Sequence, residues 1–268
     1  MTRFFSGFVP VLFAGIVISA SCNKSDNVVP YVLSYGNSVI YLKNQASDYI
    51  VYPTQSRAGT YTAFPEGIEI DDITGAINVS KSETGLRYRI THTGLNGDTT
   101  STIVVLSGIT FTDKFYHLSQ NDSIAFPVYN ANSAGAVPVS GSSFDDGNLA
   151  NSGGCSVKTT NGQINLAETV RNGVFGNTPQ NDVRKDFDIV YRLNDASGKA
   201  VNKLRVRIYW YNTMMDVAPD LWQTLNDRQS QGVFLQMNNT NSGQVTARST
   251  SSLAIAKPRP PCVIIIGQ

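Results

Sequence analysis

Three cysteines, Cys22, Cys155 and Cys262, carry the most reactive side chains in this chain of 268 residues. Cys22 comes directly after an uncharged, apolar run over residues 4–18 and three small residues at 19–21. A positively charged start, an apolar core and a small-residue exit are the parts of a secretory signal. The run is shorter than the roughly 20 apolar residues that cross a bilayer. The sequence therefore predicts a signal peptide over residues 1–21.

The placement of Cys22 resembles a bacterial lipoprotein signal, in which the signal peptide is removed and the new N-terminal cysteine is acylated, for example with palmitate. The resemblance implies a membrane anchor on Cys22 and a lipidated tether over residues 22–30. Ser19 stands where that family usually has Leu, Val or Ile. Asn23 in place of Asp implies the outer membrane, with surface exposure, rather than retention at the inner membrane. The alternative is ordinary cleavage after Ala20, which releases a soluble protein.

The two remaining cysteines, Cys155 and Cys262, are candidates for one disulfide. A signal peptide implies an oxidising compartment, where such a bond persists. The alternative is a pair of buried thiols that behave as small hydrophobes. Neither cysteine has a second Cys or His close by in the sequence, so their spacing does not match a zinc site.

The remaining side chains do not form a recognisable catalytic pattern. The two histidines, His92 and His117, lack a sequence context that suggests a triad or a metal site. No GxSxG, HExxH or phosphate-binding loop occurs in the sequence. The acidic stretches at 71–72 and 145–148 have turn chemistry without the ligand spacing of a calcium loop. We therefore expect a non-enzymatic protein with no cofactor and no metal.

Composition narrows the classes of partner. Removing residues 1–21 leaves 20 basic and 20 acidic residues. A balanced charge gives no long-range field to attract polyanions, so nucleic acid is excluded as an expected partner. Charged residues make up 15% of the chain, below the roughly 25% typical of globular domains. Asn, Ser, Thr and Gly take their place, as in many exported all-β proteins, because these residues suit strand faces and tight turns.

The first part of the chain reads as strands separated by turns. Residues 39–42, 49–52, 68–70 and 103–106 are rich in β-branched and aromatic side chains. Residues 87–93 alternate, with Tyr88, Ile90 and His92 on one face. The Asn-Gly pair at 96–97 is a strong hairpin signal.

An internal repeat links the two halves of the chain. Residues 70–79 align with residues 157–166, so that Gly75 matches Gly162 at an offset of 87 positions. Residues 88–90 then match 187–189 at an offset of 99, which predicts an insertion around residues 171–182. Repeats define the architecture, and a unit of this length suits a small β-sandwich.

Residues 58–93 resemble the bacterial cadherin-like or immunoglobulin-like repeat of secreted and surface proteins. The matching motifs are Gly-Thr-Tyr at 59–61, the Pro-Glu-Gly-Ile-Glu-Ile-Asp run at 65–71, Thr-Gly-Ala-Ile at 74–77 and Gly-Leu-Arg-Tyr at 85–88. The second copy fits loosely, since Cys155 stands in the place of Ile68. The resemblance implies an all-β fold of two tandem immunoglobulin-like β-sandwiches, over residues 31–112 and 113–268.

The second domain is larger. Residues 203–211 predict a strand with Leu204, Val206, Ile208 and Trp210 on its core face. Residues 219–228 have apolar side chains at helical spacing after a proline and predict a short helix. A strand is predicted at 233–237, and the apolar C-terminal run 263–266 predicts a closing strand buried in the sandwich.

The candidate ligand surface is the other face of the 203–211 strand, together with the helix. It comprises Arg205, Arg207, Tyr209, Tyr211 and Trp222, because flat rings beside bidentate donors suit protein or sugar partners. The alternative is a solvated sheet face or a contact between the two domains. The expected function is a non-enzymatic, surface-displayed lipoprotein for adhesion or for binding envelope proteins. Accessory glycan binding in a polysaccharide-uptake system is the second expectation, and an exported hydrolase is a third.

Overall fold

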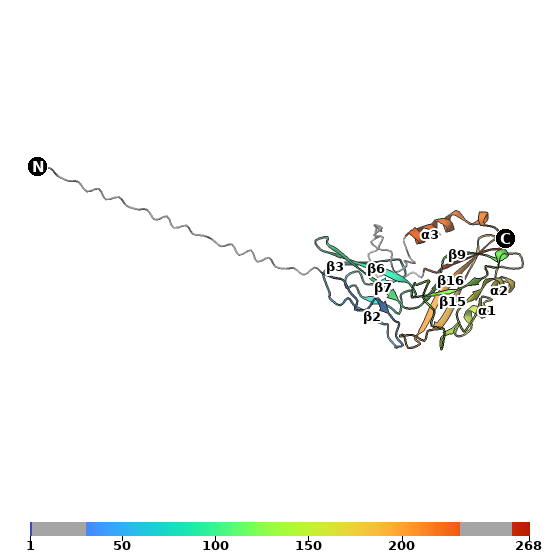
Figure 1. Cartoon of the computed structure of the whole chain (residues 1–268), viewed down its shortest axis with the longest axis horizontal. Coiled ribbons are helices and arrows are strands. Elements are labelled where there is room, and N and C mark those ends of the chain that lie inside the picture. The colour runs from blue at the N-terminus through green and yellow to red at the C-terminus, as the bar shows by residue number, and fades with distance from the viewer. Residues whose placement is uncertain (2–30, 231–258) are drawn as a thin grey trace. The chain divides into compact units, whose positions relative to one another are not determined.

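The computed structural model describes residue 1, residues 31–230 and residues 259–268. The chain divides into two units, Met1–Tyr31 and Val32–Gln268, and the second contains every described helix and strand (Figure 1). The predicted signal peptide, Cys22, the tether to residue 30 and the predicted strand at 233–237 lie outside the described residues. No described helix is both long enough and apolar enough to cross a bilayer.

The first part of the second unit is a β-sandwich of two sheets. One sheet has the order β1-β7-β6-β3 and the other β2-β5-β4. The strands are β1 Val39–Ile40, β2 Ile50–Val51, β3 Gly59–Phe64, β4 Glu69–Ile70, β5 Ile77–Asn78, β6 Arg87–Gly94 and β7 Thr99–Leu106. Tyr88, Ile90 and His92 of β6 are all buried, which confirms the predicted alternation. The β6–β7 turn closes with Gly94 N donating to Asp98 O at 2.8 Å.

The second part is also a sandwich, with sheets β12-β15-β16-β17-β9 and β10-β14-β13. Its strands are β9 Lys114–His117, β10 Ile124–Ala125, β12 Ser143–Phe144, β13 Ser156–Val157, β14 Ile164–Asn165, β15 Val183–Arg192, β16 Val201–Tyr211 and β17 Cys262–Ile266. A separate pair joins β8 Ile109–Phe111 to β11 Pro127–Tyr129. The helices are α1 Leu149–Ser152, α2 Leu166–Arg171 and α3 Pro219–Ser230, with short 3-10 turns at Leu118–Gln120 and Met214–Asp216.

The two sandwiches repeat one strand order. In the larger sheets β12-β15-β16 corresponds to β3-β6-β7, and in the smaller sheets β10-β14-β13 corresponds to β2-β5-β4. The fold class predicted from sequence, two tandem immunoglobulin-like sandwiches with a larger second copy, is confirmed. Residues 32–268 form one compact unit, and the division at residue 112 stays a prediction.

The turn at the centre of the sequence repeat has the same geometry in both copies. Asp71 N donates to Ala76 O at 2.9 Å, and the equivalent Lys158 N donates to Gln163 O at 2.8 Å. Gly75 and Gly162 have positive φ angles of 70° and 72°, which glycine adopts without steric cost. A Cβ on Gly162 would lie 2.7 Å from a ring carbon of Phe144. Both backbone shape and close approach therefore require glycine at this turn.

Gly162→Ala is expected to lower the free energy of unfolding by about 2–4 kcal/mol, since it adds both backbone strain and a clash with a core aromatic ring. Gly173 is the matched control, because its φ is 76° and an added methyl group would meet nothing within 4 Å. Gly173→Ala is expected to cost about 1 kcal/mol. If urea unfolding shows the same loss of free energy for both variants, the ring of Phe144 moves aside at no energetic cost and the predicted clash is refuted.

The C-terminal strand β17 is the main difference between the sandwiches. In the first sandwich β1 pairs directly and in parallel with β7. In the second, β17 lies between β16 and β9 and is parallel to both. All five of its residues are buried. Val263 and Ile265 face the core between the sheets, whereas Cys262, Ile264 and Ile266 belong to a second apolar cluster beneath α3. The prediction of a buried closing strand is confirmed.

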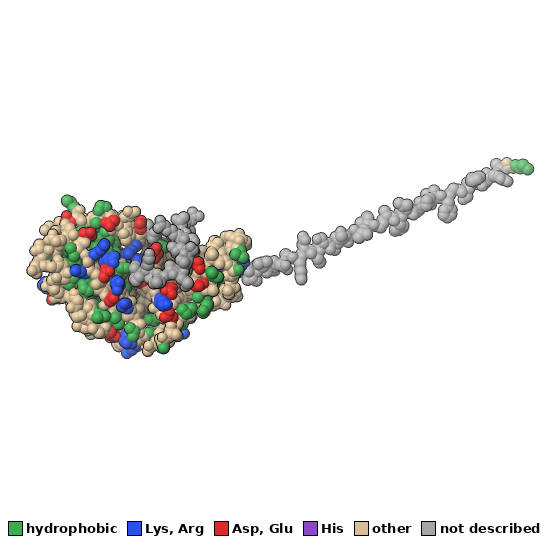
Figure 2. All heavy atoms as spheres, turned by 180° about the vertical axis from the view of Figure 1, so that it is seen from behind, with side chains coloured by type: hydrophobic (Ala, Val, Ile, Leu, Met, Phe, Trp, Pro, Cys, Tyr) green, Lys and Arg blue, Asp and Glu red, His purple; other side chains and the backbone are tan. Residues whose placement is uncertain are grey.

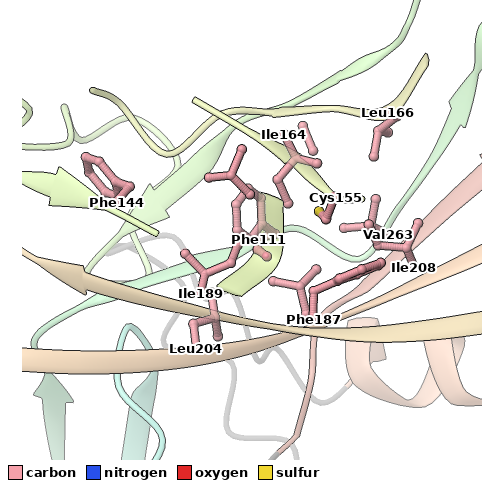
Figure 3. Packing of buried hydrophobic residues seen from close by; sticks show 14 of the residues in the cluster. Phe111, Phe144, Cys155, Ile164, Leu166, Phe187, Ile189, Leu204, Ile208 and Val263 are labelled. Carbon is pink, nitrogen blue, oxygen red and sulfur yellow. The ribbon is translucent and has the colours of Figure 1, made fainter. Parts of the chain in front are cut away.

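The disulfide predicted between Cys155 and Cys262 is wrong in this structure, because both cysteines are free and buried. Cys155 lies in the inner core among apolar side chains such as Phe111 and Val263 (Figure 3). Cys262 belongs to the cluster on the other face of the sheet. Burial raises the pKa of the Cys155 thiol to about 12. The alternative of two buried thiols describes them correctly.

Candidate functional site

The outer face of β15 and β16 carries a ladder of charged side chains. Arg207 donates two hydrogen bonds to Asp186, at 2.6 and 2.8 Å. Arg205 donates two to Asp188, at 2.7 and 3.0 Å. Both pairs join residues that are directly opposite in the antiparallel register. These hydrogen bonds lower the pKa of both carboxyls. Arg205 and Arg207, which the sequence places on the candidate ligand surface, are therefore already bound to aspartates of the neighbouring strand.

Tyr209 and Tyr211 do not form an exposed platform, so this part of the predicted ligand surface is wrong. Tyr209 is 6% exposed and Tyr211 is fully buried. Strand alternation does place both on the face opposite the inner core, as expected, but α3 covers that face with Leu221 and Leu225. The hydroxyl of Tyr211 donates to Asp182 Oδ1 at 2.6 Å, which satisfies its polar end.

Trp222 lies on α3 and remains 36% exposed. Its ring contacts the ring of Phe115 in β9, with centroids 4.7 Å apart and an interplanar angle of 39°. One side of the indole is therefore already covered by another aromatic ring. Trp210, by contrast, is in the inner core, as the sequence predicts.

A cavity of about 220 Å³ opens between α3 and the charged ladder. The lining is mostly polar. It comes from the residue before β15, from β15 and β16, from α3 and from the start of β17. The residues are Asp182, Arg184, Arg207, Tyr209, Asp220, Leu221, Thr224, Arg228, Pro260 and Cys262. Arg184 is exposed and forms no salt bridge with any described residue. Among the described residues, Arg184 is thus the guanidinium of the cavity without a carboxylate partner, whereas Arg207 and Arg228 are held by carboxylates.

A buried charge cluster supports the inner wall of this cavity. Asp113, in the link between β8 and β9, accepts from Arg228 Nη1 at 3.1 Å and from Arg259 Nη1 at 3.2 Å. It also accepts from the backbone N of Cys262 at 2.7 Å. One carboxylate thus connects α3, the start of β17 and the link between β8 and β9.

Glu83 of the first sandwich extends the cluster. Its Oε2 accepts from the backbone N of Arg259 at 2.8 Å. Burial raises the pKa of Glu83 to about 7, and the charge of Arg259 opposes the shift. None of the four charged residues Glu83, Asp113, Arg228 and Arg259 was singled out from the sequence, because the partners that each one contacts lie far away along the chain.

The charged surface is mixed in sign. On the face drawn in Figure 2, Lys and Arg side chains lie beside Asp and Glu side chains. Among the described residues, no group of three or more His, Cys, Asp or Glu side chains could hold a metal ion. His92 is buried against Tyr61, with ring centroids 4.7 Å apart.

Comparison with known proteins gives no family assignment. No protein-family model matches the chain, and no curated protein matches it. One matching solved structure is a SusE-like, surface-located polysaccharide-binding protein from the Bacteroides thetaiotaomicron heparin utilisation locus. It is 10% identical, with a TM-score of 0.23, and the match covers 66% of this chain and 34% of that one. Another is Drosophila N-cadherin EC1-4, 12% identical with a TM-score of 0.19, covering 66% of this chain and 48% of that one. This chain spans less than half of either protein, and the fold assignment rests on its own strand order.

Proposed function

We propose that this protein is a non-enzymatic binding protein, held at the outer membrane by a lipid on Cys22, and that the cavity beside α3 receives a partner protein. The observation that supports this best is Arg184, an exposed guanidinium without a salt bridge to any described residue, at a cavity beside α3. A bidentate donor of this kind suits a carboxylate. The partner chemistry that fits is an acidic side chain on a surface protein of the envelope.

The size of the cavity favours a protein partner over a bound glycan chain. Its volume of about 220 Å³ is below the roughly 300–1,000 Å³ typical of pockets for drug-sized ligands. One protein side chain fits such a space. Sugar recognition by stacking would need exposed rings, and Tyr209 and Tyr211 are buried. Trp222 is the one ring of the expected surface that keeps partial exposure, so glycan binding is the second candidate and rests on that residue.

Cross-linking on intact cells tests the protein partner. A photoreactive residue in place of Thr224, at the rim of the cavity, is expected to form an adduct with one envelope protein. Arg184→Ala in the same background should reduce the adduct about tenfold, the effect of losing a charged hot spot worth roughly 1.4 kcal/mol. Arg205→Ala is the matched control, because Arg205 is exposed but lies outside the cavity lining. An adduct that Arg184→Ala leaves unchanged would remove the cavity from the binding surface.

Glycan binding has its own readout. Binding of the purified protein to a glycan array that disappears in Trp222→Ala would favour the second candidate and count against the first. Turnover of a glycoside or ester panel would contradict both.

The anchor is tested by the intact mass of the protein from the membrane fraction. A diacyl or triacyl mass on Cys22 is expected. An unmodified chain that begins at Ser21 would show ordinary signal cleavage and refute the anchor.

A further inference from the structure

Large apolar side chains are exposed at one end of the first sandwich. Val32 is 70% exposed, Tyr52 63%, Ile73 72% and Leu95 87%. Among the described residues of the second unit, only two other large apolar side chains reach 60%, Phe126 at 60% and Met215 at 94%. Single exposed apolar residues need no explanation, but several at one end mark an interaction site.

Backbone contacts bring the four side chains to the same end. β2 pairs with β5 through Val51 and Ile77. Tyr52 directly follows β2, and the turn that carries Ile73 directly precedes β5, so both lie at the same end of this strand pair. The hydroxyl of Tyr35 donates to Gly75 O at 2.7 Å, which ties the start of the described chain to that turn.

The turn that carries Leu95 joins this end through β3. Gly59, the first residue of β3, pairs with Gly94, directly before Leu95. Two residues further along, Tyr61 N donates to Asp72 O at 2.8 Å, directly before Ile73. The β6–β7 hairpin and the start of the described chain can both be followed in Figure 1.

The length of the preceding segment limits how far this end can lie from the lipid. Nine residues, 23–31, separate Cys22 from Val32, and a fully extended chain between these two residues spans at most about 35 Å. An acyl group on Cys22 therefore keeps this end of the sandwich close to the bilayer. Apolar side chains beside a bilayer gain by entering the headgroup and acyl boundary.

We propose that this end of the first sandwich rests on the lipid surface, with Val32, Tyr52, Ile73 and Leu95 inserted into the headgroup region. The proposal rests on the lipid anchor proposed above and adds an orientation of the first sandwich on the bilayer.

The charged side chains in the turns at this end are Asp71, Asp72, Asp98 and Arg57, so this end carries a net negative charge. Asp71 accepts hydrogen bonds from Ile73 N and Thr74 N at 3.1 and 2.7 Å, and Asp98 accepts from Asn96 Nδ2 at 2.5 Å. Their carboxylates remain in water and repel anionic headgroups. The contact is therefore apolar, and neither anionic lipid nor low salt strengthens it.

Depth-dependent quenching on the full, lipid-modified protein tests the proposal. Leu95→Cys carries an environment-sensitive fluorophore, and Met215→Cys is the control, because Met215 is equally exposed but lies in the second sandwich. Cys155 and Cys262 are buried and do not compete for the label. In phosphatidylcholine vesicles, the label at 95 is expected to shift to shorter wavelength and to be quenched by spin-labelled lipids. The label at 215 should show neither effect, and an Ile73→Cys label should behave as that at 95.

Vesicle flotation separates this inference from the anchor. Protein that floats with vesicles while the label at 95 stays unquenched overturns the orientation and leaves the anchor intact. Protein that does not float overturns both. A shift at 95 in the absence of vesicles would mean that another protein surface covers this end, and it would also refute the proposal. Stronger quenching in phosphatidylglycerol vesicles would contradict an apolar contact.

Discussion

Ile265→Ala is expected to lower the free energy of unfolding by about 2–5 kcal/mol, the range for truncation of a fully buried isoleucine. Ile265 is 0% exposed and lies in β17, with β16 on one side and β9 on the other. β17 is hydrogen-bonded to a strand on each edge and packed against an apolar cluster on each face. It therefore cannot move to fill the space that the lost atoms leave. The cavity cost therefore adds to the lost burial. Urea unfolding of the purified protein measures the change through the transition midpoint at constant m-value.

Val201→Ala provides the matched control. Val201 is β-branched and lies in β16 of the same sheet, but it is 46% exposed. Its truncation is expected to change stability by no more than about 0.5 kcal/mol. A loss for Ile265→Ala as small as that for Val201→Ala would mean that β17 contributes little to the second sandwich, contrary to its central place in the sheet.

The sequence predicts the long strands and the longest helix of this fold because their signals are local. Alternation in β6 and β16, the Asn-Gly turn at 96–97 and the helical spacing in α3 each depend on residues a few positions apart. The repeat adds a longer signal, because Gly75 and Gly162 are required by the same turn geometry. These features were sufficient to predict two related sandwiches.

The same alternation misleads where a later element covers a strand. Tyr209 and Tyr211 do lie opposite the inner core, as their positions predict. Whether that face meets solvent depends on where α3 docks, and this is a tertiary contact with no signal in the strand itself. The helix buries both rings, which turns an expected binding platform into a second apolar cluster.

Strand position also explains the wrong disulfide. Cys262 is the first residue of β17, and successive residues of a strand point to opposite faces of the sheet. Cys262 shares its face with Ile264 and Ile266, whereas Cys155 lies among the residues that pack with Val263 and Ile265. Two cysteines separated by a sheet cannot meet without moving backbone.

The charge cluster around Asp113 gives the other prediction of large effect. Asp113→Ala is expected to lower the free energy of unfolding by about 3–5 kcal/mol, as when one partner of a buried ion pair is removed. The side chains of Asp113, Arg228 and Arg259 are only 10%, 17% and 9% exposed. Loss of the carboxylate takes away the shared counter-charge of two buried guanidinium groups. It also removes the acceptor for the backbone N of Cys262, at the point where β17 enters the sheet.

Asp188→Ala is the control for this prediction, because it removes an aspartate of the exposed ladder. Asp188 also binds two basic side chains, Arg205 and Lys203, but these are 45% and 57% exposed. Water replaces the lost carboxylate there, so the expected cost is about 0–1 kcal/mol. The number of ion pairs is therefore matched between the two variants, and burial is the variable. Equal losses in urea unfolding would show that the Asp113 cluster is solvated in solution. A large loss for Asp113→Ala alone would show that one buried carboxylate holds α3, β17 and the wall of the candidate binding cavity together.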